Sequence, residues 1–82
     1  MTDPEFSRLR WQCRRGMREL DALLVGWLED RYPTASDSEK SAFQELLTVS
    51  DPELVGYLLK KEAPRSEPIA AVVRQILERD HS

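Results

Sequence analysis

The side chains best able to do chemistry lie in residues 11–21, WQCRRGMRELD, where three arginines surround one glycine and follow the only cysteine. An arginine guanidinium binds a carboxylate or phosphate through two parallel hydrogen bonds. A thiol beside positive charge can become a nucleophile at a lowered pKa. A glycine permits a sharp turn and the close approach of another backbone. The stretch therefore suits either a reactive thiol or a charged contact surface.

The residues needed for independent catalysis are scarce. His81 is the only histidine and is next to last, whereas a structural zinc needs four ligands. Gly16, Gly26 and Gly56 are scattered, so no glycine loop can cradle a phosphate. No segment alternates with the period of a strand, which excludes a dinucleotide-binding fold. We expect a protein that is not an enzyme and that holds no FAD, NAD or ATP stably by itself.

Cys13 has two interpretations. The arginines beside it could activate the thiol. However, Phe6, Leu9 and Cys13 are spaced at i, i+3 and i+7, which places them on one apolar helix face. A small buried hydrophobic residue is therefore the favoured interpretation of Cys13.

The charges around Gly16 also have two interpretations. In the first, Arg14 and Arg15 end one helix, and Glu19 and Asp21 open the next, each near the helix end whose dipole favours it. Gly16 is then the left-handed residue that ends the first helix. This interpretation is purely structural.

The second interpretation is a docking surface. If the first helix extends to Arg15, then Arg8, Trp11 and Arg15 lie on one outward face, and tryptophan with arginine is the mixture enriched at interface hot spots. Gly16 then lets a partner backbone approach. Two alternatives stay open: Trp11 could cover the core as a partly buried aromatic, and Arg15 could pair with Glu19 across one turn.

Composition sets the class of protein. The chain is 40% hydrophobic and 33% charged, which fits a soluble globular domain and neither a disordered tail nor a membrane protein. The longest apolar run, residues 22–28, is far below the roughly 20 residues of a membrane span. With no apolar leader segment and a single cysteine, we expect a cytoplasmic protein.

Charge is unevenly distributed. Residues 1–18 hold five arginines and two acids, a balance of +3, and the remaining residues hold seven bases and thirteen acids, a balance of −6. A basic end on an acidic body favours a local electrostatic contact and opposes tight binding to a polyanion.

Helical periodicity dominates the chain. Apolar residues recur at i, i+3, i+4 and i+7, and Met17 extends the stripe of the second segment back by one turn. Ser36 and Glu39 form a capping-box pattern, and Asp51 followed by Pro52 indicates an N-cap and a first helical proline. The sequence predicts an all-α, compact single-domain bundle over residues 1–82, with five short helices at about 5–14, 17–31, 36–47, 52–61 and 68–79.

The stretch RWQCRRGMRELD resembles the signature of the FAD assembly factors of succinate dehydrogenase, the SdhE/YgfY family, whose hallmark is an RGxxE motif. Here the motif is Arg15, Gly16 and Glu19. The later segments LLVGWLEDRYP, EKSAFQELLTVSDPEL and GYLL follow the same pattern, so the resemblance covers about residues 8–77.

The resemblance implies a YgfY-like bundle of five helices that acts as an assembly chaperone. Such factors promote the covalent attachment of FAD to the flavoprotein subunit of succinate dehydrogenase and, in some members, of fumarate reductase. The bond joins a partner histidine to a ring methyl of the flavin, and the chemistry belongs to the flavoprotein. The RGxxE surface is implicated in contact with the flavoprotein near its flavin.

Our hypothesis is that the corner around Gly16 inserts between domains of the immature flavoprotein. Arg15 would bind a carboxylate or carbonyl of the partner, while Glu19 would accept from a partner base or fix the rotamer of Arg15. The surrounding contact area would comprise Arg8, Trp11, Arg14 and Arg18.

The rival hypothesis is a small nucleic-acid-binding or antitoxin-like regulatory protein. Five arginines on an acidic body make a weak footprint for nucleic acid, and no helix-turn-helix or stacking platform is evident. We therefore expect a protein partner, no nucleic acid and no insertion into a membrane.

Overall fold

The computed structural model describes residues 4–80, which form five α-helices and one short 3₁₀ helix, with no strand in that range. The all-α prediction is confirmed. The elements in chain order are α1 (Pro4–Gln12), α2 (Arg18–Asp30), η1 (Tyr32–Thr34), α3 (Asp37–Leu46), α4 (Asp51–Leu58) and α5 (Glu67–Asp80).

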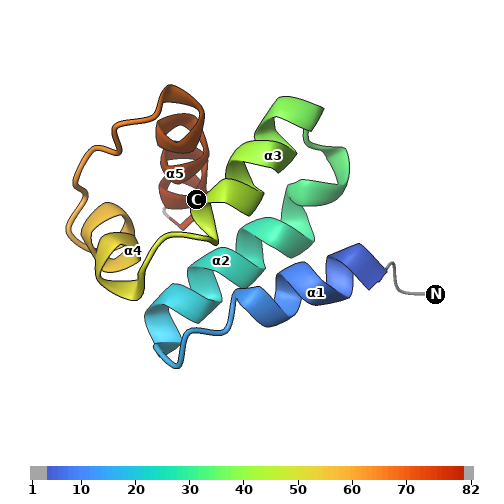
Figure 1. Cartoon of the computed structure of the whole chain (residues 1–82), viewed down its shortest axis with the longest axis horizontal. Helices are drawn as coiled ribbons and strands as arrows, with labels where there is room; N and C mark the ends of the chain where they lie inside the picture. Colours follow the sequence, from blue (N-terminus) through green and yellow to red (C-terminus); the bar gives the residue numbers. More distant parts are fainter. Residues whose placement is uncertain (1–3, 81–82) are drawn as a thin grey trace.

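The helices pack around α2 and α5 (Figure 1). α1 folds back along α2, and α5 packs against α2, α3 and α4. The chain turns sharply between α1 and α2, and the link between α3 and α4 passes close to this turn. Segments far apart in sequence therefore meet at the start of α2.

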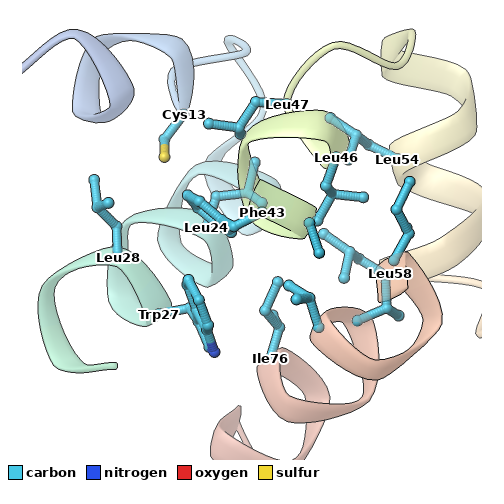
Figure 2. Close-up of a cluster of buried hydrophobic side chains, with 14 of the residues drawn as sticks. Cys13, Leu24, Trp27, Leu28, Phe43, Leu46, Leu47, Leu54, Leu58 and Ile76 are labelled. Atoms are coloured by element: carbon cyan, nitrogen blue, oxygen red, sulfur yellow. The ribbon is translucent and has the colours of Figure 1, made fainter. Parts of the chain in front are cut away.

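The core is a single apolar cluster to which all five helices contribute (Figure 2). Its largest fully buried members are Trp27 and Phe43, whose rings stack with centroids 4.6 Å apart. The rings of Tyr32 in η1 and Trp27 form a T-shaped pair with centroids 6.1 Å apart. Fully burying one large apolar side chain contributes about 1.5–3 kcal/mol, so this cluster is the main source of stability.

A polar chain joins three helices at the edge of this core. The indole Nε1 of Trp27 donates to Oε1 of Gln75 at 3.3 Å, and Nε2 of Gln75 donates to Oε2 of Glu39 at 2.6 Å. Glu39 also belongs to the predicted capping box, which is present: the Glu39 amide donates to Ser36 Oγ, and Ser36 N donates to Glu39 Oε1. The start of α3 is thereby tied to α5 and α2.

The helix boundaries differ from the expected ones at the corner between α1 and α2. α1 ends at Gln12, two residues before the expected end, and α2 begins at Arg18. The last turn tightens, since Cys13 N donates to both Leu9 O and Arg10 O. Gly16 has φ +79° and Met17 is extended, so neither helix can continue through these residues.

The start of α4 requires a correction. Asp51 is not the N-cap, because Ser50 takes that place and its Oγ accepts from Glu53 N at 3.4 Å. Asp51 and Pro52 are the first two helical residues, which frees the Asp51 carboxylate for another partner. α4 also ends earlier than expected, at Leu58, and Lys61 then adopts φ +59°, outside the helical region.

Across residues 4–80, every helix is too short or too polar to cross a membrane.

Candidate partner-docking site

The turn between α1 and α2, residues 13–17, is here called the glycine corner. Gly16 has φ +79°, in the left-handed region that favours glycine, as predicted. The prediction that it ends the first helix directly after Arg14 and Arg15 is wrong, because α1 already ends at Gln12. A Cβ built on Gly16 would meet no heavy atom within 4 Å. The outer side of the glycine corner is therefore open to the backbone of another chain.

Asp21 closes the corner from the α2 side. Its Oδ1 accepts a 2.7 Å hydrogen bond from the backbone amide of Arg15. Asp21 lies in the first turn of α2, as expected, where the helix dipole also favours its charge. Its contact with Arg15 was not foreseen, because no local sequence rule pairs residues six apart across a turn.

Arg15 points inward, and the expectation that it shares an outward face with Arg8 and Trp11 is wrong. Its side chain is only 17% exposed. Nη2 donates to the carbonyl of Leu47, and Nη1 lies 3.4 Å from Oδ1 of Asp51. The helical spacing that predicted a shared face does not apply, since α1 ends at Gln12.

Arg15 thus contacts a carboxylate and a carbonyl, the two groups expected of a partner, but both belong to its own chain. Its Nε is buried without a hydrogen-bond partner among the described residues. The alternative pairing of Arg15 with Glu19 is absent from the ion pairs and hydrogen bonds of residues 4–80. Arg15 therefore supports the glycine corner from within.

Trp11 and Met17 are the two large hydrophobic side chains exposed in the described part of the chain, at 70% and 37%. Trp11 lies in the last turn of α1, just before the glycine corner, and Met17 is the last residue of the corner. The outward Trp11 is confirmed, and the alternative that it covers the core is wrong. Met17 does not extend the buried stripe of α2, because its extended backbone places it before the helix begins.

Exposed arginines lie close to these two side chains in the sequence. Arg14 lies over the Trp11 ring, with Cζ 5.7 Å from the ring centroid, in a cation–π arrangement. Arg18, the first residue of α2, is exposed next to Met17, whereas Arg8 is exposed but lines a different hollow beside Gln44 and Thr48. Trp11 and Arg14 line a shallow hollow of about 420 Å³, which is bordered by Phe6, Ser7 and Arg10. The structure thus places Trp11 and Arg14 together in one hollow and Arg8 in another.

Glu19 faces a different hollow. It is exposed on the first turn of α2 and lines an open groove of about 470 Å³ between α2, the end of α4 and α5. The groove floor is apolar and includes Leu23, Leu58 and Leu77. In the sequence, Gly16 stands between the residues of a basic, aromatic hollow and Glu19, which lines an apolar groove.

Comparison with known proteins identifies the family. The model of the family described as flavinator of succinate dehydrogenase matches residues 7–80. The FAD assembly factor SdhE of Yersinia pseudotuberculosis is 39% identical over 74 residues, covering 90% of this chain and 84% of the relative. The FAD assembly factor SdhE of Pseudomonas aeruginosa is 35% identical over 77 residues, which cover 94% of this chain and 92% of the relative. The chain belongs to the flavinator family of succinate dehydrogenase. The resemblance inferred from residues 8–77 is confirmed.

Cys13 is not a reactive thiol in this flavinator-family chain. It is fully buried, and Figure 2 shows its sulfur directed toward the apolar cluster. Burial raises the pKa of the Cys13 thiol to about 12, against the opposing effect of the Arg15 charge. The predicted small buried hydrophobic residue is confirmed.

Residues 4–80 contain no group of three or more side chains placed to hold a metal ion. His81 lies outside the described residues. The glycine corner and the residues next to it offer a surface: the exposed indole of Trp11, the thioether of Met17, the guanidinium groups of Arg14 and Arg18, and an open glycine.

Proposed function

We propose that this chain promotes the covalent attachment of FAD to the flavoprotein subunit of succinate dehydrogenase by docking its glycine corner on the immature flavoprotein. Membership of the flavinator family supports the reaction. The observation that carries the docking site is the exposure of Trp11 and Met17 on either side of an open Gly16. Tryptophan, methionine and arginine are residue types enriched at protein–protein interfaces.

The contact residues have distinct roles in this proposal. Trp11 is the apolar anchor, with Arg14 held over its ring. Arg8, Arg14 and Arg18 meet acidic groups of the flavoprotein, while Glu19 accepts from a partner base. Gly16 lets the partner backbone approach the corner. Arg15 keeps the corner in shape and does not reach the flavoprotein.

The chain acts as a chaperone, and the covalent bond forms on the flavoprotein. Its one thiol is buried and protonated at neutral pH, so Cys13 supplies no nucleophile. Docking contributes by holding the partner histidine and the flavin in near-attack geometry, an effect that can supply several kcal/mol. FAD is held by the partner, and the chain binds no cofactor stably by itself.

We extend the proposal to the flavoprotein of fumarate reductase, which the same surface would bind and which some family members are expected to flavinylate. We place the activity in the cytoplasm, where a single unpaired cysteine is ordinary. A protein partner suits the corner better than a nucleic acid, since the chain beyond residue 18 carries a balance of −6.

The test is flavinylation of purified apo-flavoprotein by Trp11→Ala and by Gly16→Asn. Asparagine is among the residues that best tolerate a positive φ, so it adds bulk with little strain. We expect near-normal melting and at least a roughly tenfold loss of covalent flavin, measured by absorbance of the denatured flavoprotein, since hot-spot truncation costs about 2 kcal/mol or more.

Arg14→Ala and Arg74→Ala form a matched pair, because both arginines are exposed but Arg74 lies on α5. Only Arg14→Ala should lose activity. Arg15→Ala is a poor test, since it leaves Leu47 and Asp51 without their partner and perturbs the fold. If wild-type protein adds no covalent flavin, the function is wrong. If Trp11→Ala and Gly16→Asn stay fully active, the docking site is wrong.

A further inference from the structure

The glycine corner is held by contacts with residues distant in sequence. Its residues lie between two helices and have few helical hydrogen bonds of their own. Asp21 fixes the Arg15 backbone, and the Arg15 side chain reaches residues 32 and 36 positions further along the chain. The shape of the corner therefore depends on the link between α3 and α4.

That link presents two hydrogen-bond acceptors to Arg15, a carbonyl and a carboxylate. Leu47 is the C-cap of α3, and its carbonyl belongs to the helix end that carries the negative end of the dipole. Asp51 is the first residue of α4, where Ser50 has taken over capping and left the Asp51 carboxylate available. Both groups face the same guanidinium.

Arg15 differs from its neighbours in this respect. Arg14 and Arg18 are exposed, whereas the Arg15 side chain is 17% exposed. A cation withdrawn from water needs charged or dipolar partners, and the only carboxylate paired with it in the described residues is that of Asp51. The Asp51 charge thus favours the inward rotamer of Arg15.

We infer that Asp51, which lies outside the RGxxE motif, is a positioning residue for docking: through Arg15 it fixes the glycine corner in its docking-competent shape. This inference rests on the proposed function. Without the Asp51 charge, Arg15 keeps only the Leu47 carbonyl, and the corner visits other conformations. Only a fraction of the molecules can then dock, which weakens apparent affinity by that fraction. Once docked, the complex reacts at the normal rate.

The experiment compares Asp51→Asn with Asp37→Asn. Asp37 is the first residue of α3 after the N-cap Ser36, so both variants lose a carboxylate from the same helical position. Only Asp51 contacts Arg15. Two quantities are measured: amide exchange at Arg15 in the free protein, and the concentration of factor that gives half-maximal flavinylation of apo-flavoprotein.

For Asp51→Asn we expect Arg15 amide exchange to accelerate about fivefold, the half-maximal concentration to rise about three- to tenfold, and the saturating rate to stay unchanged. Asp37→Asn should match wild type in all three. If Asp51→Asn lowers the melting temperature markedly, Asp51→Glu replaces it, and restored values with Glu support the inference.

Two results would overturn it. Unchanged exchange and unchanged half-maximal concentration remove the positioning role. Faster exchange with an unchanged half-maximal concentration makes Asp51 a structural contact only. An inactive wild-type protein instead refutes the proposed function, and the exchange data then still report whether Asp51 fixes the corner.

Discussion

Single side chains at the glycine corner divide into inward and outward groups. The two that looked most reactive, Cys13 and Arg15, both point inward. Trp11 and Met17, which are apolar, point outward. This reversal of the usual arrangement suits a surface made for another protein, because the apolar groups are exposed while a charged group maintains the shape.

The Cys13 thiol gives the first prediction. Its pKa is raised to about 12 in the folded protein from an ordinary value of about 9, so the protonated thiol is favoured by folding. The resulting stability is fully present below about pH 9 and is lost as pH rises toward 12. We expect Cys13→Ala to be less stable than wild type at pH 7 but to lose stability less steeply above pH 9, measured by denaturant unfolding.

Thiol labelling provides the independent check on Cys13. A maleimide at about pH 7 should modify wild-type protein slowly, at the rate of transient opening, and rapidly in denaturant. Fast labelling of the folded protein would contradict the buried position.

The starts of α3 and α4 show that one sequence pattern, a serine N-cap with a glutamate three residues later, can lead to different side-chain contacts. Ser36 with Glu39 and Ser50 with Glu53 have the same spacing. Glu39 completes a capping box, whereas Glu53 accepts from the hydroxyl of Tyr57 at 3.2 Å. The difference arises because Gln75 of α5 also binds Glu39 and holds its carboxylate at the start of α3.

Glu39 gives the second prediction. The hydrogen bond from the Ser36 backbone, with others from Gln75 and Ser36, lowers the pKa of Glu39. A lowered pKa in the folded protein stabilises the fold when the pH is above the ordinary glutamate pKa of about 4.3. That stabilisation is lost as the pH falls through the pKa of Glu39 in the folded protein. We expect Glu39→Gln to be less stable than wild type at pH 7, with the difference shrinking toward pH 3.

Glu53→Gln is the matched control for Glu39, because it occupies the same position in α4. Thermal melting at several pH values compares the two. An acid dependence in Glu53→Gln that equals that of Glu39→Gln would contradict the assignment.

Local rules predicted the elements but not the contacts between them. The apolar spacing, the Ser36 capping box and the left-handed Gly16 are properties of neighbouring residues, and the structure contains all three. The inward Arg15 depends on Leu47 and Asp51, which reach it only through the packing of α3 and α4. Ser50 was missed as an N-cap because Asp51 is an equally good capping residue by type.

The whole molecule separates its charges along the sequence. Residues 1–18 have a balance of +3 and the rest a balance of −6, so the docking end and the body carry opposite signs. A basic docking segment favours encounters with an acidic surface of the partner.

Association with the flavoprotein should therefore depend on salt. Raising NaCl from about 0.05 M to about 0.5 M shortens the screening length severalfold. We expect the association rate constant to fall about tenfold and the dissociation rate constant to change by less than about threefold, measured by surface plasmon resonance.

Arg18→Gln and Arg74→Gln test the origin of that salt dependence, since both arginines are exposed and only Arg18 borders the glycine corner. The salt dependence should weaken in Arg18→Gln alone. If the salt dependence weakens equally in both variants, it arises from the overall charge of the chain and not from the glycine corner.

One tryptophan is buried and the other is exposed, so tryptophan fluorescence can report on folding and on docking separately. Trp27 is fully buried, with its indole N–H bound to Gln75, whereas Trp11 is 70% exposed at the docking surface. Emission from Trp27 reports whether the bundle is folded, and a soluble quencher reaches only Trp11. A flavin brought near the glycine corner would accept energy from Trp11 and quench its emission. Association of the two proteins could therefore be followed without an added dye.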